Sequence, residues 1–393
     1  MSLVRVLAVR VLRDAERDRR FVDEVLETVR EGALSARDRA FLTHLVLGVT
    51  RRRRTLDWLL RKISGVREFD PQIHQILRVA LYEIFVLRGA AHAAVDEAVE
   101  HAKKASARSA KFVNAVLRKA AAADLEALLP EDPGLRTSHP DWLVRRWRRF
   151  YGERLEEILE ASNAVLPVTA RVQLRRTSRE ALGLKPGNRP DSVILEGPPG
   201  ESNAVREGLV TVQDETAMAV APLVAGNRVV DLCASPGGKA THLAERGMAV
   251  VASDVTLEKV RLVRESARRL GVDLSFVVAD GRRLAGRFDA VLLDAPCTNT
   301  GVLARRADAR WRLREADVPA AAGLQRALLE NAATLAPEIV YSTCSIEPEE
   351  NESQIDAFLG GHRDWTCDHR ELILPGPTAA GGFAARLRKR PHG

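Results

Sequence analysis

The chain has 393 residues, of which 46% are hydrophobic, 29% are charged and only 5% are aromatic. This length exceeds that of one ordinary domain, and the apolar content excludes a wholly disordered chain. The net charge is +7, and the whole excess lies in residues 1–130, which carry 24 Lys and Arg against 17 Asp and Glu.

A basic module joined to a neutral one is typical of a protein with a polyanion partner, although a merely soluble basic surface explains the charge equally well. The four cysteines form no C-x-x-C pair, so we expect no zinc ribbon and no other metal site. Arg5 and Arg10 interrupt the first apolar stretch, and no run approaches the length of a membrane span. We therefore expect a cytoplasmic protein with reduced thiols and no membrane contact.

The N-terminal third shows helical periodicity and no alternating strand pattern before about residue 165. Apolar positions at helical spacing predict helices over residues 3–13, 36–63, 73–87, 91–104 and 110–122. Short loops between such helices indicate a compact bundle. Pro130, Pro133, Gly134 and Pro140 then interrupt the pattern and mark a linker.

Basic residues cluster on these predicted helices. The clusters are Arg51–Arg54, Arg61–Lys62, Lys103–Lys104 and Lys111/Arg118/Lys119. Four successive arginines cannot all face one core, so we expect several to be solvated and free to meet phosphates. For any single arginine, a solvated helix face without a ligand is an equally good interpretation. Residues 91–120 resemble the NusB-like RNA-binding helical domain, through V-D-E-A-V-E-H-A-K followed by K-F-V-N-A-V-L-R.

The middle of the chain predicts a small mixed subdomain. Residues 141–162 form one or two helices with a second basic face, Arg145–Arg149. Short strands follow at 168–174, 192–195 and 208–212, separated by turns rich in Gly, Pro and Asn. The basic segment Arg171–Arg179 could touch RNA or could be a charged surface.

In the last third, apolar strands alternate with helices. The predicted strands are 228–233, 249–254, 274–280, 288–296 and 338–345, and the predicted helices are 235–247, 256–271 and 319–335. This alternation predicts a doubly wound, mostly parallel sheet, which binds ligands outside the carboxyl ends of its strands. The side chains at those ends are Asp231, Cys233, Asp254, Asp280, Asp294, Cys297 and Cys344.

A glycine loop follows the first of these strands. It runs Cys233, Ala234, Ser235, Pro236, Gly237, Gly238, Lys239, and it matches neither G-x-G-x-x-G nor a Walker loop. Glycines let backbone N–H groups approach a ligand. Asp254 follows about 20 residues later in the sequence, the separation expected of a carboxylate that holds a ribose diol. Asp280 could accept an adenine amino proton. Either aspartate could instead cap a helix or solvate a loop, and Lys239 could contact cofactor or substrate.

Two further motifs carry thiols, D-A-P-C-T-N-T-G at 294–301 and Y-S-T-C-S-I-E-P-E-E-N-E at 341–352. With D-L-C-A-S-P-G-G-K and the Q-D-E of 213–215, they resemble the RNA cytosine-5 methyltransferases that use S-adenosylmethionine. Together with the NusB-like N-terminus, they resemble the 16S ribosomal RNA cytosine-5 methyltransferase B family (RsmB, Sun or Fmu). The resemblance covers most of the chain and is weakest at 131–210.

The resemblance implies three domains. These are a NusB-like RNA-binding bundle at 1–130, linker helices with a small α/β RNA-binding subdomain at 131–215, and a Rossmann-like methyltransferase domain at 216–393. It also implies that Cys344 attacks C6 of the cytosine, that Cys297 assists release of the adduct, and that Asp294 contacts the cofactor and the base edge. We expect a monomer that acts on 16S rRNA and not on DNA, since a DNA enzyme would use the P-C cysteine. The alternatives are the same chemistry on tRNA and a non-catalytic RNA-binding factor.

The chain departs from the family pattern at two places. Asn299 replaces a small residue in the P-C loop, and Gly381–Ala384 replaces D-G-F-F in a packing strand. Arg305, Arg306 and Arg310 follow the P-C loop and could grip phosphates, while Trp311 could stack on a base or simply pack. The basic tail is a further candidate phosphate contact, with Arg386, Arg388, Lys389 and Arg390.

Overall fold

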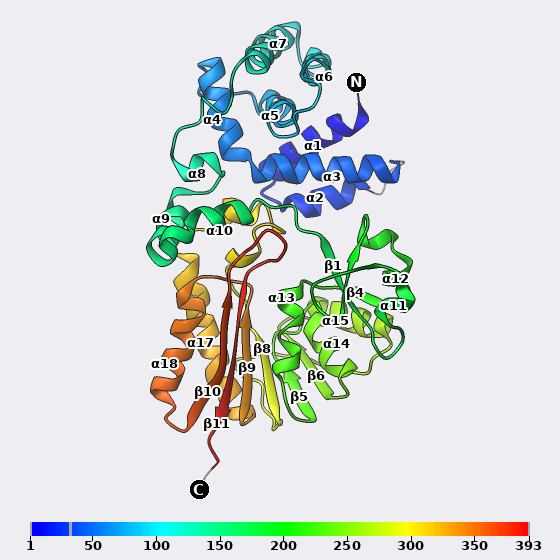
Figure 1. The fold of residues 1–393 in the computed structure, drawn as a ribbon, viewed down its shortest axis with the longest axis vertical. Coiled ribbons are helices and arrows are strands. Elements are labelled where there is room, and N and C mark those ends of the chain that lie inside the picture. Colours follow the sequence, from blue (N-terminus) through cyan, green and yellow to red (C-terminus); the bar gives the residue numbers. More distant parts are fainter. Residues whose placement is uncertain (1, 31–33, 392–393) are drawn as a thin grey trace. The chain divides into compact units, whose positions relative to one another are not determined.

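The computed structural model describes residues 2–30 and 34–391, and the chain forms two compact units. Met1–Asn163 and Arg306–Arg312 make up the first unit, and Ala164–Arg305 and Leu313–Gly393 make up the second. Figure 1 shows the helical and the sheet-containing parts. The units divide inside the predicted middle domain, but a division by packing does not test the predicted three domains, which stay a prediction.

The first unit is built from helices. They are α1 (Leu3–Arg17), α2 (Val22–Arg30), α3 (Ala36–Arg51), α4 (Arg53–Ser64), α5 (Pro71–Phe85), α6 (Ala91–Lys103), α7 (Ala107–Ala122), α8 (Pro133–Arg136), α9 (Asp141–Tyr151), the 3-10 turn η1 (Gly152–Arg154), α10 (Leu155–Ala161) and α16 (Ala309–Arg312). Most of the longer ones bury one apolar stripe, as α1 does with Val4, Ala8 and Val11, whereas α5 is buried on all sides. The stripes of α1–α7 meet in one core, which confirms the predicted bundle.

The predicted continuous helix over 36–63 is wrong, because the chain breaks at Arg52. That residue has φ −98° and ψ 12°, outside the α-helical region, and separates α3 from α4. Its N–H still donates to Gly48 O at 3.0 Å, so the break leaves no unpaired backbone donor there. Neither Gly nor Pro stands at the break, so the sequence carried no signal for it.

The second unit contains a small antiparallel sheet. Its strands are β1 (Val168–Val172), β2 (Lys185–Pro186), β3 (Ser192–Leu195) and β4 (Val210–Val212), in the order β2-β3-β1-β4. The short helices α11 (Arg179–Leu182) and α12 (Asn203–Arg206) and the turn η2 (Pro199–Glu201) lie in its connections. The three strands predicted here are confirmed, and β2 is an addition.

The larger sheet has seven strands in the order β10-β11-β9-β8-β5-β6-β7. Its strands are β5 (Arg228–Asp231), β6 (Ala249–Asp254), β7 (Ser275–Val278), β8 (Ala290–Asp294), β9 (Glu338–Thr343), β10 (Trp365–Ile373) and β11 (Gly382–Lys389). Strands β5–β9 are parallel, and β11 runs antiparallel to both of its neighbours. The predicted mostly parallel sheet is confirmed, although β10 was not predicted.

Helices cover both faces of this sheet (Figure 1). The remaining elements are α13 (Glu215–Met218), η3 (Ala221–Leu223), α14 (Gly238–Glu245), α15 (Leu257–Leu270), η4 (Thr300–Val302), α17 (Asp317–Leu335), η5 (Pro348–Glu350) and α18 (Glu352–Gly361). Val291 and Leu293 pack with α17 and α18, whereas Leu292 packs with α14 and α15, as alternation along β8 requires. No helix in the described ranges has the length and apolar character that crossing a membrane requires.

Strand order sets the position of the site. From β5 the chain builds outward through β6 and β7, and then returns to the other side of β5 with β8 and β9. The connections therefore diverge between β5 and β8. A crevice opens at such a point outside the carboxyl ends of the strands, where parallel sheets bind ligands.

Candidate active site

The glycine loop joins β5 to α14 at that crevice. Asp231 ends β5, and α14 begins at Gly238. Gly237 has φ +108°, and a Cβ there would lie 3.2 Å from Val263 Cα. The loop therefore requires glycine at this position. The first N–H groups of α14 face the end of the sheet as a ready site for an anionic group.

Asp254 ends β6 and lies directly beside the loop. Its carboxylate accepts hydrogen bonds from Ser235 N at 3.1 Å and from Val255 N at 2.7 Å. Lys259 Nζ lies 3.2 Å from the same carboxylate. The aspartate is 4% exposed. It shapes the loop through these hydrogen bonds, and it is the carboxylate that the sequence predicts to hold a ribose diol.

Asp231 is a buried carboxylate that no side chain of the described residues binds, and only the Cys233 backbone acts on it as a weak donor. Burial and the charge of Asp294 raise its pKa to about 8. An orphaned acid of this kind fits a ligand that brings an ammonium group, because an unpaired buried charge is costly. The amino-acid end of S-adenosylmethionine carries such a group. Sequence reasoning placed Asp231 at the strand end but gave it no ligand role.

The buried Lys239 and the partly exposed Asp294 form an ion pair across the β5–β8 divide. Lys239 Nζ donates to Asp294 Oδ2 at 2.6 Å, and Ser342 Oγ donates to Asp294 Oδ1 at 2.8 Å. Burial alone would lower the pKa of Lys239, but the negative charges of Asp294 and of the Cys344 thiolate outweigh it and raise that pKa. The ammonium reciprocally favours the thiolate form of Cys344.

Cys344 follows β9 and lines a recess of about 580 Å³, its open mouth included. Much of the lining is apolar, with Val220, Leu223, Val302 and Phe383, and Lys239 and Ser342 also lie on it. Cys344 therefore borders an open recess, and its charge interacts with that of Lys239. This arrangement suits a nucleophile.

The P-C loop is fixed to the T-C strand end by a buried glutamate. Glu350 is 0% exposed, and its carboxylate accepts hydrogen bonds from Thr298 N at 2.9 Å and Thr298 Oγ1 at 2.8 Å. Gly301 N donates to Cys344 O at 3.0 Å. These bonds bring the two cysteine motifs together, as their common edge of the sheet predicted.

Cys297 differs from Cys344 in its electrostatic setting. Burial raises its pKa well above the ordinary thiol value, and the negative charges of Cys344 and Glu350 add to the shift. Backbone N–H groups of Asn299 and Cys344 oppose it without cancelling it. Cys297 is therefore a neutral thiol at pH 7.

Asn299 occupies a left-handed backbone position with φ +60°. Asn tolerates this region better than most residues, and its Nδ2 donates to Cys297 O at 2.8 Å. The departure from the family pattern at this position is thus accommodated in the loop that carries Cys297.

Asp280 follows β7, and its carboxylate is held by its own loop. Arg282 donates to it through Nη2 at 2.5 Å and through its backbone N at 3.0 Å. The side-chain bond from Arg282 lowers the pKa of Asp280 to about 2. Contact with an adenine amino group stays a prediction for this residue.

The remaining two thiols show no reactive setting. Burial and the negative charge of Asp231 raise the pKa of Cys233. Cys367 Sγ donates to His369 O at 3.1 Å within β10. Both placements suit cysteines that pack or hydrogen-bond locally.

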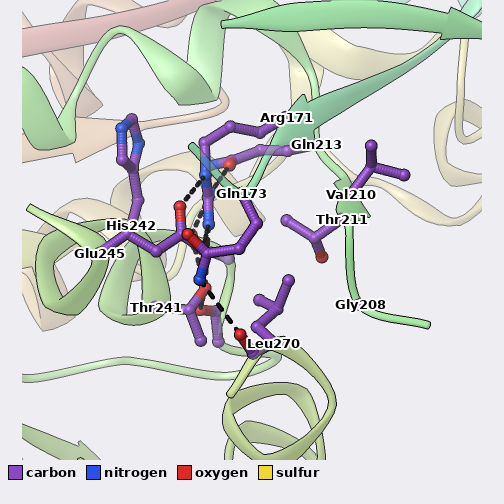
Figure 2. Close-up of polar contacts among 12 residues, drawn as sticks. Arg171, Gln173, Gly208, Val210, Thr211, Gln213, Thr241, His242, Glu245 and Leu270 are labelled. Atoms are coloured by element: carbon purple, nitrogen blue, oxygen red, sulfur yellow. Dashed lines mark hydrogen bonds and ion pairs between the residues drawn. The ribbon is translucent and has the colours of Figure 1, made fainter. Parts of the chain in front are cut away.

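Arg171 is the centre of a buried polar network that reaches the cofactor loop (Figure 2). Its guanidinium donates to Glu245 at 2.7 and 3.0 Å, to Gly238 O at 2.8 Å and to Thr241 Oγ1 at 3.2 Å, and it also contacts Gln213 Oε1. Neither interpretation of the basic segment, RNA contact or charged surface, holds for Arg171, because its side chain is 1% exposed and fully engaged.

A second set of bonds joins the small sheet to the end of α15. Gln173 Nε2 donates to Leu270 O at 3.1 Å, and Arg269 donates to Val210 O at 3.0 Å. A Cβ on Gly208, labelled in Figure 2, would lie 1.7 Å from Arg269 O, so this approach requires glycine. The small sheet is thereby fixed to the two helices that flank the cofactor loop.

Two of the three arginines after the P-C loop are engaged by other residues of the protein, whereas the exposed Arg306 stays a predicted phosphate contact. Arg310 is 0% exposed and donates to Ser162 O at 2.6 Å and Asn163 Oδ1 at 2.8 Å, so the predicted phosphate contact is wrong. Arg305 is held by Asp214, with Nε 2.9 Å from Oδ2. Trp311 packs in the first unit, where its Nε1 donates to Thr50 O at 2.8 Å.

The run of four arginines is also more buried than expected. Arg51 is 8% exposed, which contradicts a role for it in meeting phosphates. Arg53 pairs with Glu16 at 2.9 Å, and Arg54 pairs with Asp141 at 2.6 Å. In the tail, Arg386 and Arg388 pair with Asp368 at 2.7 and 2.9 Å, so these charges are already partly compensated.

Three family profiles match consecutive parts of the chain. Residues 217–392 match 16S rRNA methyltransferase RsmB/F, residues 2–122 match the NusB family, and residues 139–183 match the ferredoxin-like domain of RsmF/B-like methyltransferases. The chain is 36% identical over 389 residues to the ribosomal RNA small subunit methyltransferase B of Sodalis glossinidius, with 90% of each covered.

Two solved structures share the fold. The crystal structure of PH0851 is similar with a TM-score of 0.78 and 25% identity, over 99% of this chain and 100% of that chain. NSun6 from Pyrococcus horikoshii, solved with SFG, is similar over 64% of this chain and 99% of its own, with a TM-score of 0.57 and 21% identity.

Proposed function

Since the chain belongs to the family of 16S rRNA methyltransferases RsmB/F, we propose that it methylates C5 of a cytosine in 16S rRNA, with S-adenosylmethionine as methyl donor. The observation that carries the proposal is the pairing of two unlike thiols. Cys344 lies on an accessible recess with Lys239, and Cys297 is held neutral on the adjoining strand end.

The cofactor site is formed by the loop from Cys233 to Lys239 and by acids at the strand ends. Asp231 would take the ammonium group, and Asp254 the ribose hydroxyls, because both carboxylates border the loop. We assign to the same site the backbone groups of Ala234, Ser235, Pro236, Gly237 and Gly238 and the carboxylates of Asp280 and Asp294, which lie at or after the carboxyl ends of β5, β7 and β8. When bound, S-adenosylmethionine supplies a methyl group on a positively charged sulfur.

Cys344 is the proposed nucleophile. Its thiolate adds to C6 of the cytosine, and the resulting enamine makes C5 nucleophilic enough to take the methyl group. The transfer breaks the S–CH3 bond and leaves S-adenosylhomocysteine. The C5 proton then passes to solvent, its electron pair restores the ring double bond, and the C6–S bond breaks to return the thiolate. Lys239 favours the thiolate at the start and at the end of this sequence.

Cys297 is proposed to assist the breakdown of the adduct. As a neutral thiol it does not compete with Cys344 for C6, which supports a division of roles between the two cysteines. Asp294 is proposed to accept a hydrogen bond from the amino edge of the base. Its carboxylate is already oriented for this by Lys239 and Ser342.

We propose that the first unit binds RNA phosphates through exposed cations that lie outside the run Arg51–Arg54. They are Arg61, Lys62, Lys103, Lys104, Lys111, Arg118 and Lys119. Each is exposed, so each can meet a phosphate without leaving a buried partner unpaired. We further propose that the protein acts as a monomer in the cytoplasm, on RNA and not on DNA.

The test is methyl transfer from labelled S-adenosylmethionine to 16S rRNA and, separately, to tRNA. Label in 16S rRNA at a cytosine that bisulfite sequencing then identifies would support the proposal. Label only in tRNA would move the substrate to tRNA. No label in either RNA, with the cofactor bound, would refute the enzyme and leave an RNA-binding factor. The inactive control is Cys344→Ala.

A further inference from the structure

A second recess lies wholly within the first unit, between α4 and α16. Its volume is about 440 Å³, and Trp58 and Arg61 of α4 line it together with Arg53 and Trp311. Ligand pockets usually measure roughly 300–1,000 Å³. The recess is therefore large enough for a small planar ligand with a charged group.

The recess is basic. Arg53, Arg54 and Arg61 line it against one acid, Asp57. The carboxylate of Asp57 is already bound, by Arg78 Nε at 2.7 Å and by a nitrogen of a neighbouring histidine at 2.8 Å. Arg61 is exposed, and within the described residues its guanidinium has no hydrogen bond or ion pair. The recess thus offers a cation with no acid committed to it.

The aromatic residues of the recess are fixed by their edges. Trp58 Nε1 donates to Leu128 O at 3.3 Å, and Trp311 Nε1 donates to Thr50 O at 2.8 Å. Both polar edges are satisfied inside the protein, so stacking is what the rings can still offer. A cation lies over one face of each ring, with Lys62 Nζ 4.9 Å from the Trp58 centroid and Arg53 Cζ 5.9 Å from that of Trp311, so a base would stack on the opposite face.

We propose that this recess binds one unpaired nucleotide of the RNA, with its base against Trp58 or Trp311 and its phosphate on Arg61. The proposal rests on the proposed function, since it names part of the RNA site. Aromatic faces beside cations are the usual means of holding single-stranded nucleic acid. A flanking nucleotide fits better than the reacting cytosine, because the recess contains no thiol.

Trp311 connects the recess, along the chain, to the loop that carries Cys297. It belongs to the segment Arg306–Arg312, which continues the chain from the loop of Cys297 and packs in the first unit. Asp308 Oδ2 accepts from Val22 N at 2.9 Å, and the buried Arg310 anchors the same segment. A nucleotide in the recess therefore contacts the chain segment that leads to the P-C loop.

The test uses the full chain and a 16S rRNA fragment that the wild type methylates. Arg61→Ala and Trp58→Ala should each weaken RNA affinity by about tenfold, in the range measured for loss of a stacked base, and Trp58→Phe should restore most of it. Arg264→Ala removes another exposed arginine from a helix, α15, and should leave affinity unchanged. Affinity for S-adenosylhomocysteine and thermal melting report folding.

Photo-crosslinking of 4-thiouridine-substituted RNA supplies a second readout that needs no variant to fold. Crosslinks on a peptide that contains Trp58 or Trp311 support the proposal. Wild-type affinity in Arg61→Ala together with no crosslink on either peptide overturns it, while methylation by the wild type shows that the proposed function stands. Failure of the wild type to bind or methylate any RNA would instead refute the proposed function, and the recess with it.

Discussion

Arg171 Nη1 donates a 2.8 Å hydrogen bond to the carbonyl oxygen of Gly238. The donor belongs to β1 of the small sheet, and the acceptor is the first residue of α14, where the cofactor loop ends. The same guanidinium forms two bonds to Glu245, one helix length further on. The small sheet therefore holds both ends of the helix on which the cofactor site is built.

Loss of the Arg171 network should destabilise the second unit and loosen the cofactor loop. Glu245→Gln leaves a buried guanidinium without its counter-charge, which costs about 3–5 kcal/mol of unfolding free energy. Arg171→Lys keeps the charge but cannot reproduce the bonds to Gly238 and Glu245 together, so affinity for S-adenosylhomocysteine should fall. Denaturant titration and calorimetry measure the two effects.

Glu180→Gln is the matched control for this network. Glu180 pairs with Arg179 at 3.8 Å on the surface, with its side chain 77% exposed. Its loss should cost less than about 1 kcal/mol and leave cofactor affinity unchanged. Equal effects of the two glutamate substitutions would argue against a positioning role for Arg171.

The two cysteines should fail in different ways. Cys344→Ala removes the nucleophile, so neither methylated RNA nor a covalent protein–RNA species should form. Cys297→Ala leaves the nucleophile in place, so a Cys344–RNA species should accumulate toward one per enzyme. Denaturing gels with labelled RNA separate the outcomes. A covalent species in Cys344→Ala would contradict the assignment.

Asp231 should make stability depend on pH. Its folded pKa of about 8 exceeds the unfolded value near 4, so the folded state binds more protons between these limits. The free energy of unfolding should consequently fall as pH rises from about 4 to 8, by at most about 1.4 kcal/mol per pH unit from this group. Asp231→Asn should flatten this slope in denaturant titrations of the cofactor-free protein.

The same substitution tests the ligand role. If Asp231 takes the ammonium group of the cofactor, Asp231→Asn should weaken S-adenosylhomocysteine binding at pH 8, where the wild-type carboxylate is increasingly ionised. A flat pH slope with unchanged affinity would leave Asp231 as a buried acid without a ligand.

Glu350 should affect release of the adduct more than its formation. Glu350→Ala removes the acceptor for both Thr298 bonds, each of which involves a charged group. Hydrogen bonds of this kind contribute roughly 1.5–3 kcal/mol, so release should slow by about ten- to hundredfold if Cys297 is misplaced. Rapid-quench kinetics with separate detection of covalent and methylated RNA measures both steps; equal slowing of both would contradict this role.

The parallel sheet and the two cysteine motifs were predictable because each strand is an apolar run that ends in a reactive residue. Strand topology then brings Asp294 and Cys344 to one edge without any information on side-chain contacts. Their meeting follows from the fold alone.

The buried arginines were not predictable, because their partners are remote in sequence. Arg171 and Arg310 read as surface charges among other arginines, yet Glu245 and Asn163 hold them in the interior. The same holds for Asp231, whose lack of any side-chain partner among the described residues is visible only in three dimensions. At all three positions the outcome depends on contacts between residues that are far apart in the sequence.

The first unit is made from two separate stretches of chain, since Arg306–Arg312 packs with Met1–Asn163. Its N-terminal helices are consequently not an exchangeable cassette. In a chimera that exchanges only residues 1–163 for those of a relative, Arg310 and Trp311 would pack against residues of the other protein. Grafting RNA specificity between such enzymes therefore calls for moving this heptapeptide together with the helices.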